Sequence, residues 1–273
     1  MSRLGRILTI FCLFILKVKA EREEVLEELG LAKNAFDDQY LGCRQATEDR
    51  IKTQDIFKAE MANKNFRRAW KEAEKIWDQK RKDSVDLDDL PEGFGDLHAV
   101  AVVAYTGFIR QRFNEAVKSA GKSYRAYTEE FHFKFLHYYL TVALQLLYKD
   151  CDGERRTSYQ GYEDLLYWLP GGTTRVKFGH FLHTSSSQSV ASQAGNASFF
   201  TVLGCSGVPV DGFSEYPQEE EVVLPGYEVF SVEQTPGEAN EFYLNSTGRR
   251  CSNFNCALVQ GRCLCLRYVQ PHV

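Results

Sequence analysis

The sequence predicts an α+β protein in which a helical N-terminal half packs on a β-rich C-terminal core. Proline use changes along the chain: the first 169 residues contain only Pro91, and the last 104 contain six prolines. Apolar side chains recur at helical spacing in the first half, and short β-type runs between Gly and Pro turns fill the second. Helices followed by strands are typical of the α+β class. No internal repeat is visible, so we expect one domain.

The first 20 residues have the pattern of a secretory signal peptide. Arg3 and Arg6 give a basic start, and residues 7–16 are almost all apolar. Residues 18–20 offer small side chains for cleavage. About ten apolar residues cannot cross a hydrocarbon core of about 30 Å. We therefore expect a secreted mature chain of residues 21–273.

The mature chain is expected to be helical over about 21–150 and β-rich over about 151–273. Helical periodicity marks three segments: the segment with Phe66, Trp70, Ala73 and Trp77, residues 99–117 ahead of Gly121, and residues 127–148. Their aromatic side chains are expected in the core. Strands are expected at residues 176–178, 198–202, 221–224 and 227–232.

Membrane attachment is not expected. The most apolar internal run, residues 131–148, contains His132, Lys134 and His137, which favours a buried helix over a membrane span. The C-terminal CLCLRYVQPHV has no apolar tail of the kind removed when a lipid anchor is added.

Charge and histidine spacing exclude several functions. The chain has a net charge of −4, and without the four basic residues of the signal it has 29 Lys and Arg against 37 Asp and Glu, a net −8. This balance argues against nucleic acid as a partner, because phosphate binding needs a basic face. The six histidines have no metal-ligand spacing, so no metal is expected. No GxSxG, GxGxxG or phosphate-loop pattern is present.

The cysteines and sequons agree with secretion. Seven cysteines follow the signal and form no paired CxxC knuckles, so disulfides are expected rather than zinc, with one thiol left over. Asn196 and Asn245 begin glycosylation sequons.

A pair of glutamates is the first candidate for chemistry. If Glu219 and Glu221 enter a strand, they share one face with Cα atoms about 6.5–7 Å apart, and Glu220 faces the other way. Two such carboxylates suit cleavage of a glycosidic bond, one stabilising a cationic sugar and the other orienting the nucleophile. The alternative is a charged strand end that discourages edge pairing.

A run of hydroxyl side chains, residues 184–187, is the second candidate. These side chains could position a ribose or a carboxylate. The alternative is a polar turn.

Taken together, these segments resemble the vertebrate ecto-ADP-ribosyltransferases, the arginine-specific R-S-E class. The resemblance runs from about Ala35 to Cys256, and the order and spacing of the matching segments make it specific. The matching segments are AFDDQYLGC at 35–43, VAYT at 103–106, FNEAV at 113–117, FKFLHYYLT at 133–141, FG at 178–179 with Phe181 after it, and EEEVVLP at 219–225.

The resemblance implies a reaction. NAD is the co-substrate and binds in a cleft of the β-rich core, the nicotinamide–ribose bond breaks, and ADP-ribose moves to an arginine of an acceptor protein. By this resemblance Glu221 is the principal catalytic carboxylate. Glu219 orients the guanidinium, and Tyr216 contacts the acceptor.

The family's S-x-S element can be aligned in two ways. It falls on Thr184 and Ser186 if one residue is inserted after Phe181, and otherwise on Ser185 and Ser187. The first alignment is preferred because it brings Val190 and Ala191 into register. The resemblance thus implies catalytic Glu221, Glu219, Ser186 and Thr184, with NAD contacts from Tyr159, Gln160, Gly161, Ser185, Ser186 and Glu221.

One position departs from the family pattern. Gln160 stands between Tyr159 and Gly161, where the family has an arginine. Arginine offers a positive fork that suits phosphates. Its loss would remove about 1.5–3 kcal/mol, or roughly ten- to a hundredfold in binding or rate. Replacement charges could come from Arg155, Arg156 or Arg175.

Three functions follow from this pattern. The leading one is protein-arginine ADP-ribosyltransferase. The alternatives are an NAD glycohydrolase, against which the retained Glu219 argues, and a catalytically weak or inactive binding module, which Gln160 favours. The resemblance also implies disulfides Cys43–Cys256 and Cys151–Cys205. It gives Cys251, Cys263 and Cys265 no clear partners, and a clip between Cys251 and one of the other two is our own interpretation.

Overall fold

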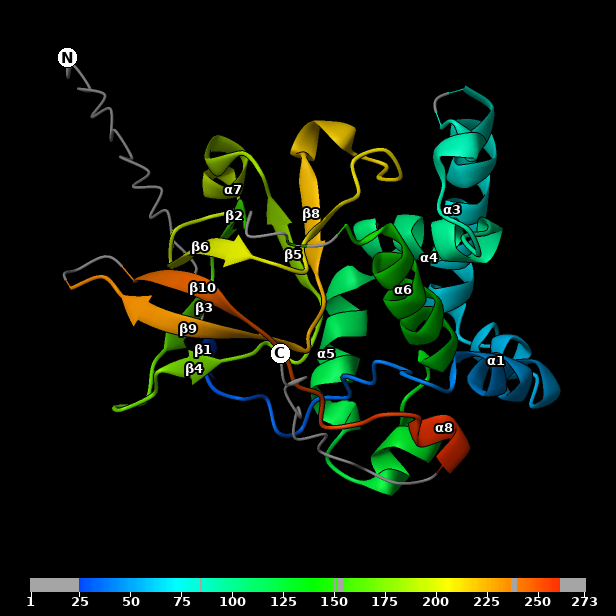
Figure 1. The fold of residues 1–273 in the computed structure, drawn as a ribbon, viewed down its shortest axis with the longest axis horizontal. Helices are drawn as coiled ribbons and strands as arrows, with labels where there is room; N and C mark the ends of the chain where they lie inside the picture. Colours follow the sequence, from blue (N-terminus) through cyan, green and yellow to red (C-terminus); the bar gives the residue numbers. More distant parts are fainter. Residues whose placement is uncertain (1–24, 84, 150, 152–154, 237–239, 261–273) are drawn as a thin grey trace, which may run out of the picture.

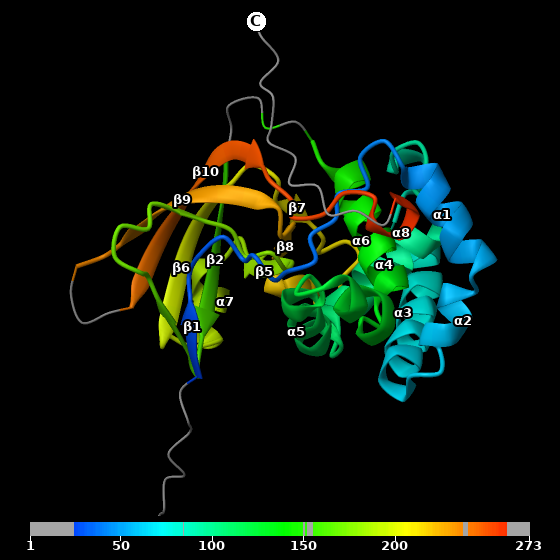
Figure 2. The same cartoon turned by 90° about the horizontal axis from the view of Figure 1, so that it is seen from below.

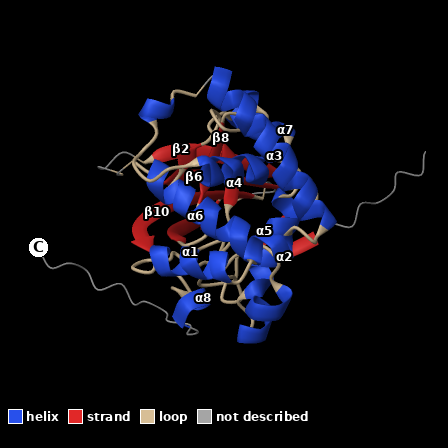
Figure 3. Ribbon diagram, turned by 90° about the vertical axis from the view of Figure 1, so that its right-hand side faces the viewer, coloured by secondary structure: helices blue, strands red, loops and turns tan. Residues whose placement is uncertain are grey.

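The structure is a computed structural model that describes residues 25–83, 85–149, 151, 155–236 and 240–260 (Figure 1). The expected signal peptide lies outside these residues. Among the described residues, no helix is long and apolar enough to cross a membrane. Helices and strands form two adjoining parts, which Figure 2 shows side by side and Figure 3 shows with the helices in front.

The helical part occupies residues 44–147. Its helices are α1 (Arg44–Thr53), α2 (Ile56–Glu60), α3 (Lys64–Asp83), α4 (Asp96–Thr106), α5 (Arg110–Ala120) and α6 (Lys134–Leu147), with a 3-10 turn at Leu87–Asp89 and a π-helical turn at Ala126–Glu130. Phe66, Trp70, Ala73 and Trp77 of α3 are all buried. The expectation that these aromatic side chains belong to the core is confirmed.

The prediction of one helix over residues 99–117 was wrong. Gly107 adopts an extended conformation directly after α4, and α5 starts at Arg110. Glycine pays a larger entropy cost in a helix interior than other residues, which favours a break here. The break directs the N-terminus of α5 toward the strands.

The predicted helix over residues 127–148 was also too long. Its regular part begins only at Lys134, because the buried carboxylate of Glu60 accepts the backbone N–H groups of Lys134 (2.5 Å) and Phe135 (3.2 Å). These N–H groups have no partner within their own helix, so the side-chain oxygens of Glu60 fix the helix start by accepting from them. Burial raises the pKa of Glu60 to about 8.

The β part holds two sheets. The smaller one pairs β1 (Val25–Glu28) in parallel with β3 (Leu165–Trp168). The larger one has the order β4 (Arg175–Val176), β9 (Glu228–Gln234), β10 (Glu241–Arg250), β6 (Ser198–Gly204), β2 (Arg156–Tyr162), β5 (Leu182–Ser185), β8 (Glu221–Leu224) and β7 (Val208–Pro209). Neighbouring strands are antiparallel except β10 and β6.

The strand predictions met different outcomes. Those for residues 198–202 and 221–224 are confirmed by β6 and β8, and β9 covers most of 227–232. The strand expected at 176–178 ends at Val176, because the backbone N–H of Lys177 donates to the carbonyl of Gly30 at 2.9 Å instead of to β9; the buried side chain of Lys177 pairs with Asp37. β1 lies within the part expected to be helical, and the short helices α7 (Gln188–Gln193) and α8 (Ala257–Gln260) lie within the part expected to be β.

Two disulfides link segments that are distant in the sequence. The expected disulfides Cys43–Cys256 and Cys151–Cys205 are both present, with Cα atoms 6.0 and 5.4 Å apart. The expected clip to Cys251 involves cysteines outside the described residues.

Candidate functional site

The candidate site lies where β8 meets the helices. β8 separates two apolar clusters: Val223 packs with the helices, whereas Val222 packs with the interior of the sheet. Because side chains alternate along a strand, Glu221 shares the helix-facing side with Val223. Glu221 is fully buried there.

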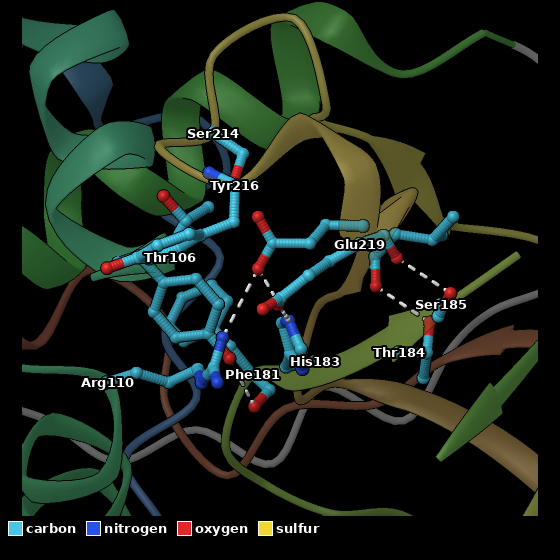
Figure 4. A network of polar contacts seen from close by, with 12 residues as sticks. Thr106, Arg110, Phe181, His183, Thr184, Ser185, Ser214, Tyr216 and Glu219 are labelled. Carbon is cyan, nitrogen blue, oxygen red and sulfur yellow. Dashed lines mark hydrogen bonds and ion pairs between the residues drawn. The ribbon is translucent and has the colours of Figure 1, made fainter. Parts of the chain in front are cut away.

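Two donors hold one oxygen of this carboxylate. Nε2 of His183 lies 2.5 Å from Glu221 Oε1, and Nη1 of Arg110 lies 3.2 Å from the same atom (Figure 4). Arg110 reaches it because α5 begins there, and His183 reaches it from β5, the neighbouring strand. Buried carboxylates require such partners, because an unpaired buried charge is costly.

The second oxygen of Glu221 has no such support. Oε2 is buried and has no hydrogen-bond partner among the described residues. An unsatisfied buried acceptor costs about 1–3 kcal/mol. A hydroxyl group delivered by a ligand would remove that cost.

Glu219 lies close to Glu221, but its backbone does not form the strand that we expected. It ends a 3-10 turn, Pro217–Glu219, and Glu220 follows with a left-handed φ of 47°. The explanation by alternation along a strand was therefore wrong. Nevertheless, Oε2 of Glu219 lies 3.9 Å from His183 Nε2, so the two carboxylates meet around one imidazole.

The hydroxyl run anchors this glutamate loop. Ser185, directly opposite Glu221 in the sheet, donates to the carbonyl of Glu219 at 2.7 Å. Ser186 is exposed and donates to Oε2 of Glu220 at 2.8 Å. Thr184 points to the other face of the strand, and its hydroxyl donates to the carbonyl of Val222 at 2.7 Å. This geometry disfavours the preferred alignment through Thr184 and favours the one through Ser185.

A cavity of about 590 Å³ adjoins the pair of donors. Gln160, Arg110 and His183 all line it. Gln160 donates to the carbonyl of the next residue, Gly161, at 2.6 Å. Glu221 itself does not line the cavity, so Arg110 and His183 lie between the carboxylate and the open space.

Of the six residues expected to contact NAD, only Gln160 lines this cavity. Tyr159 lies opposite Ser185 in the sheet and does not line this cavity. Gly161 packs against the end of α7: a Cβ there would lie 2.5 Å from the carbonyl oxygen of Ala191 and closer still to that of Gly195. Glycine is needed at this position because the backbones approach so closely.

Burial keeps the histidines of the site neutral. Desolvation lowers the pKa of His183 against the opposing effect of Glu221, and it lowers that of His180 in the cavity wall to about 3. A neutral His183 with its proton on Nε2 donates to Glu221. His183, Glu219 and Glu221 each offer a metal-ligand atom within 4.8 Å of the others. However, Arg110 already supplies a cation to the same Glu221 oxygen.

Sequence reasoning missed both Arg110 and His183. Arg110 was assigned to the interior of one long helix, which concealed its place at a helix start. His183 sits one residue before the hydroxyl run, and its pairing with Glu221 depends on the β5–β8 register.

The site therefore combines a helical part, a mixed sheet and two carboxylates that meet around one imidazole at their junction. The chain matches the model of the NAD:arginine ADP-ribosyltransferase family over residues 29–252 and belongs to that family.

Curated relatives agree with this assignment. Ecto-ADP-ribosyltransferase 5 of Bos taurus is 36% identical over 85% of this chain and 74% of its own length. T-cell ecto-ADP-ribosyltransferase 1 of Rattus norvegicus is 38% identical over 84% and 79%. The GPI-linked NAD(P)(+)–arginine ADP-ribosyltransferase 1 of Mus musculus is 36% identical over 85% and 73%.

Solved structures are similar in the same region. The eucaryotic mono-ADP-ribosyltransferase ART2.2 superposes with a TM-score of 0.73 at 38% identity, covering 84% of this chain and 98% of that one. A mutant of ART2.2 in complex with NAD gives a TM-score of 0.72 at 36% identity over the same shares. The expected α+β ADP-ribosyltransferase fold is therefore confirmed.

Proposed function

We propose that this chain transfers ADP-ribose from NAD to arginine side chains of proteins and releases nicotinamide. The observation that carries the proposal is the Glu221 carboxylate, which has one oxygen held by His183 and Arg110 and the other without a donor in the part of the chain that the structure describes. A fixed carboxylate with a free acceptor atom suits a sugar that offers a hydroxyl and develops positive charge.

Glu221 acts on the donor half of the reaction. Its free oxygen accepts a hydroxyl of the nicotinamide ribose, and its charge stabilises the cationic sugar. The bond between the ribose carbon and the nicotinamide nitrogen breaks, and its electron pair leaves with nicotinamide. Burial lowers the pKa of His183, so this imidazole donates a hydrogen bond to Glu221 without adding a second positive charge to that of Arg110.

Glu219 acts on the acceptor half. Its side chain is 39% exposed, so a protein arginine can reach it. It orients the guanidinium, a nitrogen of which bonds to the ribose carbon, and it takes up the proton that this nitrogen loses. Tyr216 is 42% exposed on the same loop and provides a further surface for the acceptor.

The serines hold the loop in register, with Ser185 and Ser186 fastening Glu219 and Glu220 to β5.

We assign the chain to the extracellular space as a secreted protein. Two disulfides support this assignment, because such bonds persist in oxidising compartments. The relatives' names describe ecto-enzymes. Asn196 and Asn245 are both exposed, as acceptors of glycans must be.

One assay separates this function from its alternatives. The mature protein is incubated with NAD and agmatine, a small guanidino acceptor, and the products are identified by mass spectrometry. Transferase activity gives an ADP-ribosyl-agmatine adduct, which should disappear in Glu221→Gln. Free ADP-ribose alone would identify an NAD glycohydrolase, and neither product would identify a binding module, the role that Gln160 favours. Adduct formation that survives Glu221→Gln would overturn the assignment of Glu221.

A further inference from the structure

We propose that Arg110, at the start of α5, supplies the positive charge that binds the phosphates of NAD in this chain. This inference rests on the proposed function. Its starting point is Gln160, an uncharged residue in the cavity wall where the resemblance implied an arginine. A dinucleotide carries two phosphate charges, and arginine is the side chain best suited to hold them.

The arginines suggested by the sequence lie elsewhere. Arg155 and Arg156 line a different cavity, and Arg156 is four residues from Gln160 along β2, or roughly 13 Å. Arg175 is on β4, the edge strand, separated from β2 by three other strands and therefore by roughly 19 Å. None of the three lines the cavity with Gln160.

The cationic side chains of Lys118 and Arg110 line that cavity, and they differ in whether their nitrogens are free to bind a phosphate. Lys118 is engaged with Glu27 at 2.8 Å. Arg110 touches Glu221 through Nη1 only, and its other two guanidinium nitrogens have no partner among the described residues. Its side chain is 32% exposed, so these remaining N–H groups are accessible to a ligand. The histidines add no charge, because burial lowers the pKa of both His180 and His183.

Arg110 reduces the negative charge of the cavity wall. Four carboxylate side chains contribute to the lining, Glu27, Glu115, Glu163 and Asp164, so with Arg110 and Lys118 the side-chain charges sum to −2 (2 − 4). Without Arg110 the sum would be −3 (1 − 4), and the wall would repel a dianion more strongly. Arg110 also connects the two halves of the site. One nitrogen contacts Glu221, and the free nitrogens can contact phosphate, so binding the dinucleotide and fixing the carboxylate involve the same side chain.

The test measures binding of ADP-ribose by calorimetry, because this probe has the same phosphates and is not cleaved. Arg110→Gln should weaken binding roughly ten- to a hundredfold, the value of a charge-assisted contact. Arg112→Gln is the matched control: it removes the same charge from the same helix at an exposed position outside the cavity wall. It should change binding less than threefold, about the effect expected of an exposed charge.

Two further variants separate charge from structure. Arg110→Lys should bind more tightly than Arg110→Gln because it keeps the charge. Adding Gln160→Arg to Arg110→Gln should restore binding to within about threefold of wild type, because the charge returns to the same cavity.

Equal binding by wild type and Arg110→Gln would overturn the inference, and so would a failure of Gln160→Arg to restore binding. In either case the wild type would still bind and react, so the proposed function would stand. A wild-type protein that binds neither ADP-ribose nor NAD would overturn the proposed function, and this inference with it.

Discussion

Replacing Gly161 with alanine tests how the sheet positions the glutamate loop. The added Cβ would lie 2.5 Å from the carbonyl oxygen of Ala191, whereas ordinary contacts are about 3.5 Å, so α7 must retreat by about 1 Å. Overpacking costs about 1–3 kcal/mol, and a clash with backbone atoms belongs at the upper end. For a chain of this size, about 3 kcal/mol lowers the midpoint of thermal unfolding by roughly 6–12 °C.

The displacement of α7 should also shift the loop that carries Glu219 and so lower the rate of the reaction. α7 starts directly after Ser187, whose N–H is bonded to Ser185 Oγ at 3.0 Å, and Ser185 in turn holds the carbonyl of Glu219. A shift of about 1 Å in catalytic geometry can cost up to roughly a hundredfold in rate. We expect Gly161→Ala to lower kcat/KM for adduct formation accordingly.

The matched control is Gly171→Ala, because a Cβ at Gly171 meets no atom within 4 Å. Both variants are compared by calorimetric unfolding and by the agmatine assay. If Gly161→Ala unfolded within about 2 °C of Gly171→Ala and reacted at the same rate, α7 would not support the site as described.

Three other changes have defined outcomes. Burial raises the folded-state pKa of Glu60 to about 8 from an ordinary 4.5. The free energy of unfolding should therefore fall as pH rises from 4.5 to 8, by at most roughly 5 kcal/mol. Glu60→Gln should remove this pH dependence in urea titrations, and an unchanged profile would contradict the prediction. The Cys43–Cys256 disulfide closes a loop of 213 residues, so replacing both cysteines with serine should lower the free energy of unfolding by roughly 5 kcal/mol in denaturant titrations; a loss below about 1 kcal/mol would refute the entropic estimate. Glu219→Gln should slow adduct formation far more than NAD cleavage, as followed by nicotinamide release; equal losses of both would show that Glu219 serves the donor half.

Much of the helical core was predictable because the periodic apolar pattern that indicates it lies within a short stretch of sequence. Phe66, Trp70 and Trp77 show helical periodicity in the sequence and are buried in α3. The errors came from interactions across the chain. Glu60 shortens α6 from a distance of 74 residues, and Lys177 leaves its expected strand because its backbone N–H bonds to Gly30, which lies far earlier in the chain. No local window contains such contacts.

The site was predictable in its residue types and not in its geometry. Glu219 and Glu221 were identified correctly as a pair that meets, but the reason given was an alternating strand, and the structure has a 3-10 turn followed by a left-handed residue. The disulfides followed from family resemblance. Arg110 and His183 could not be found in this way, because their meeting at Glu221 depends on the β5–β8 register and on the break after α4.

The most direct test of the account is a crystal structure of Glu221→Gln grown with NAD. We expect a hydroxyl of the nicotinamide ribose within roughly 2.6–3.2 Å of the side chain at position 221, with phosphate oxygens at Arg110. A dinucleotide bound away from β8, with residue 221 still enclosed by His183 and Arg110, would contradict it.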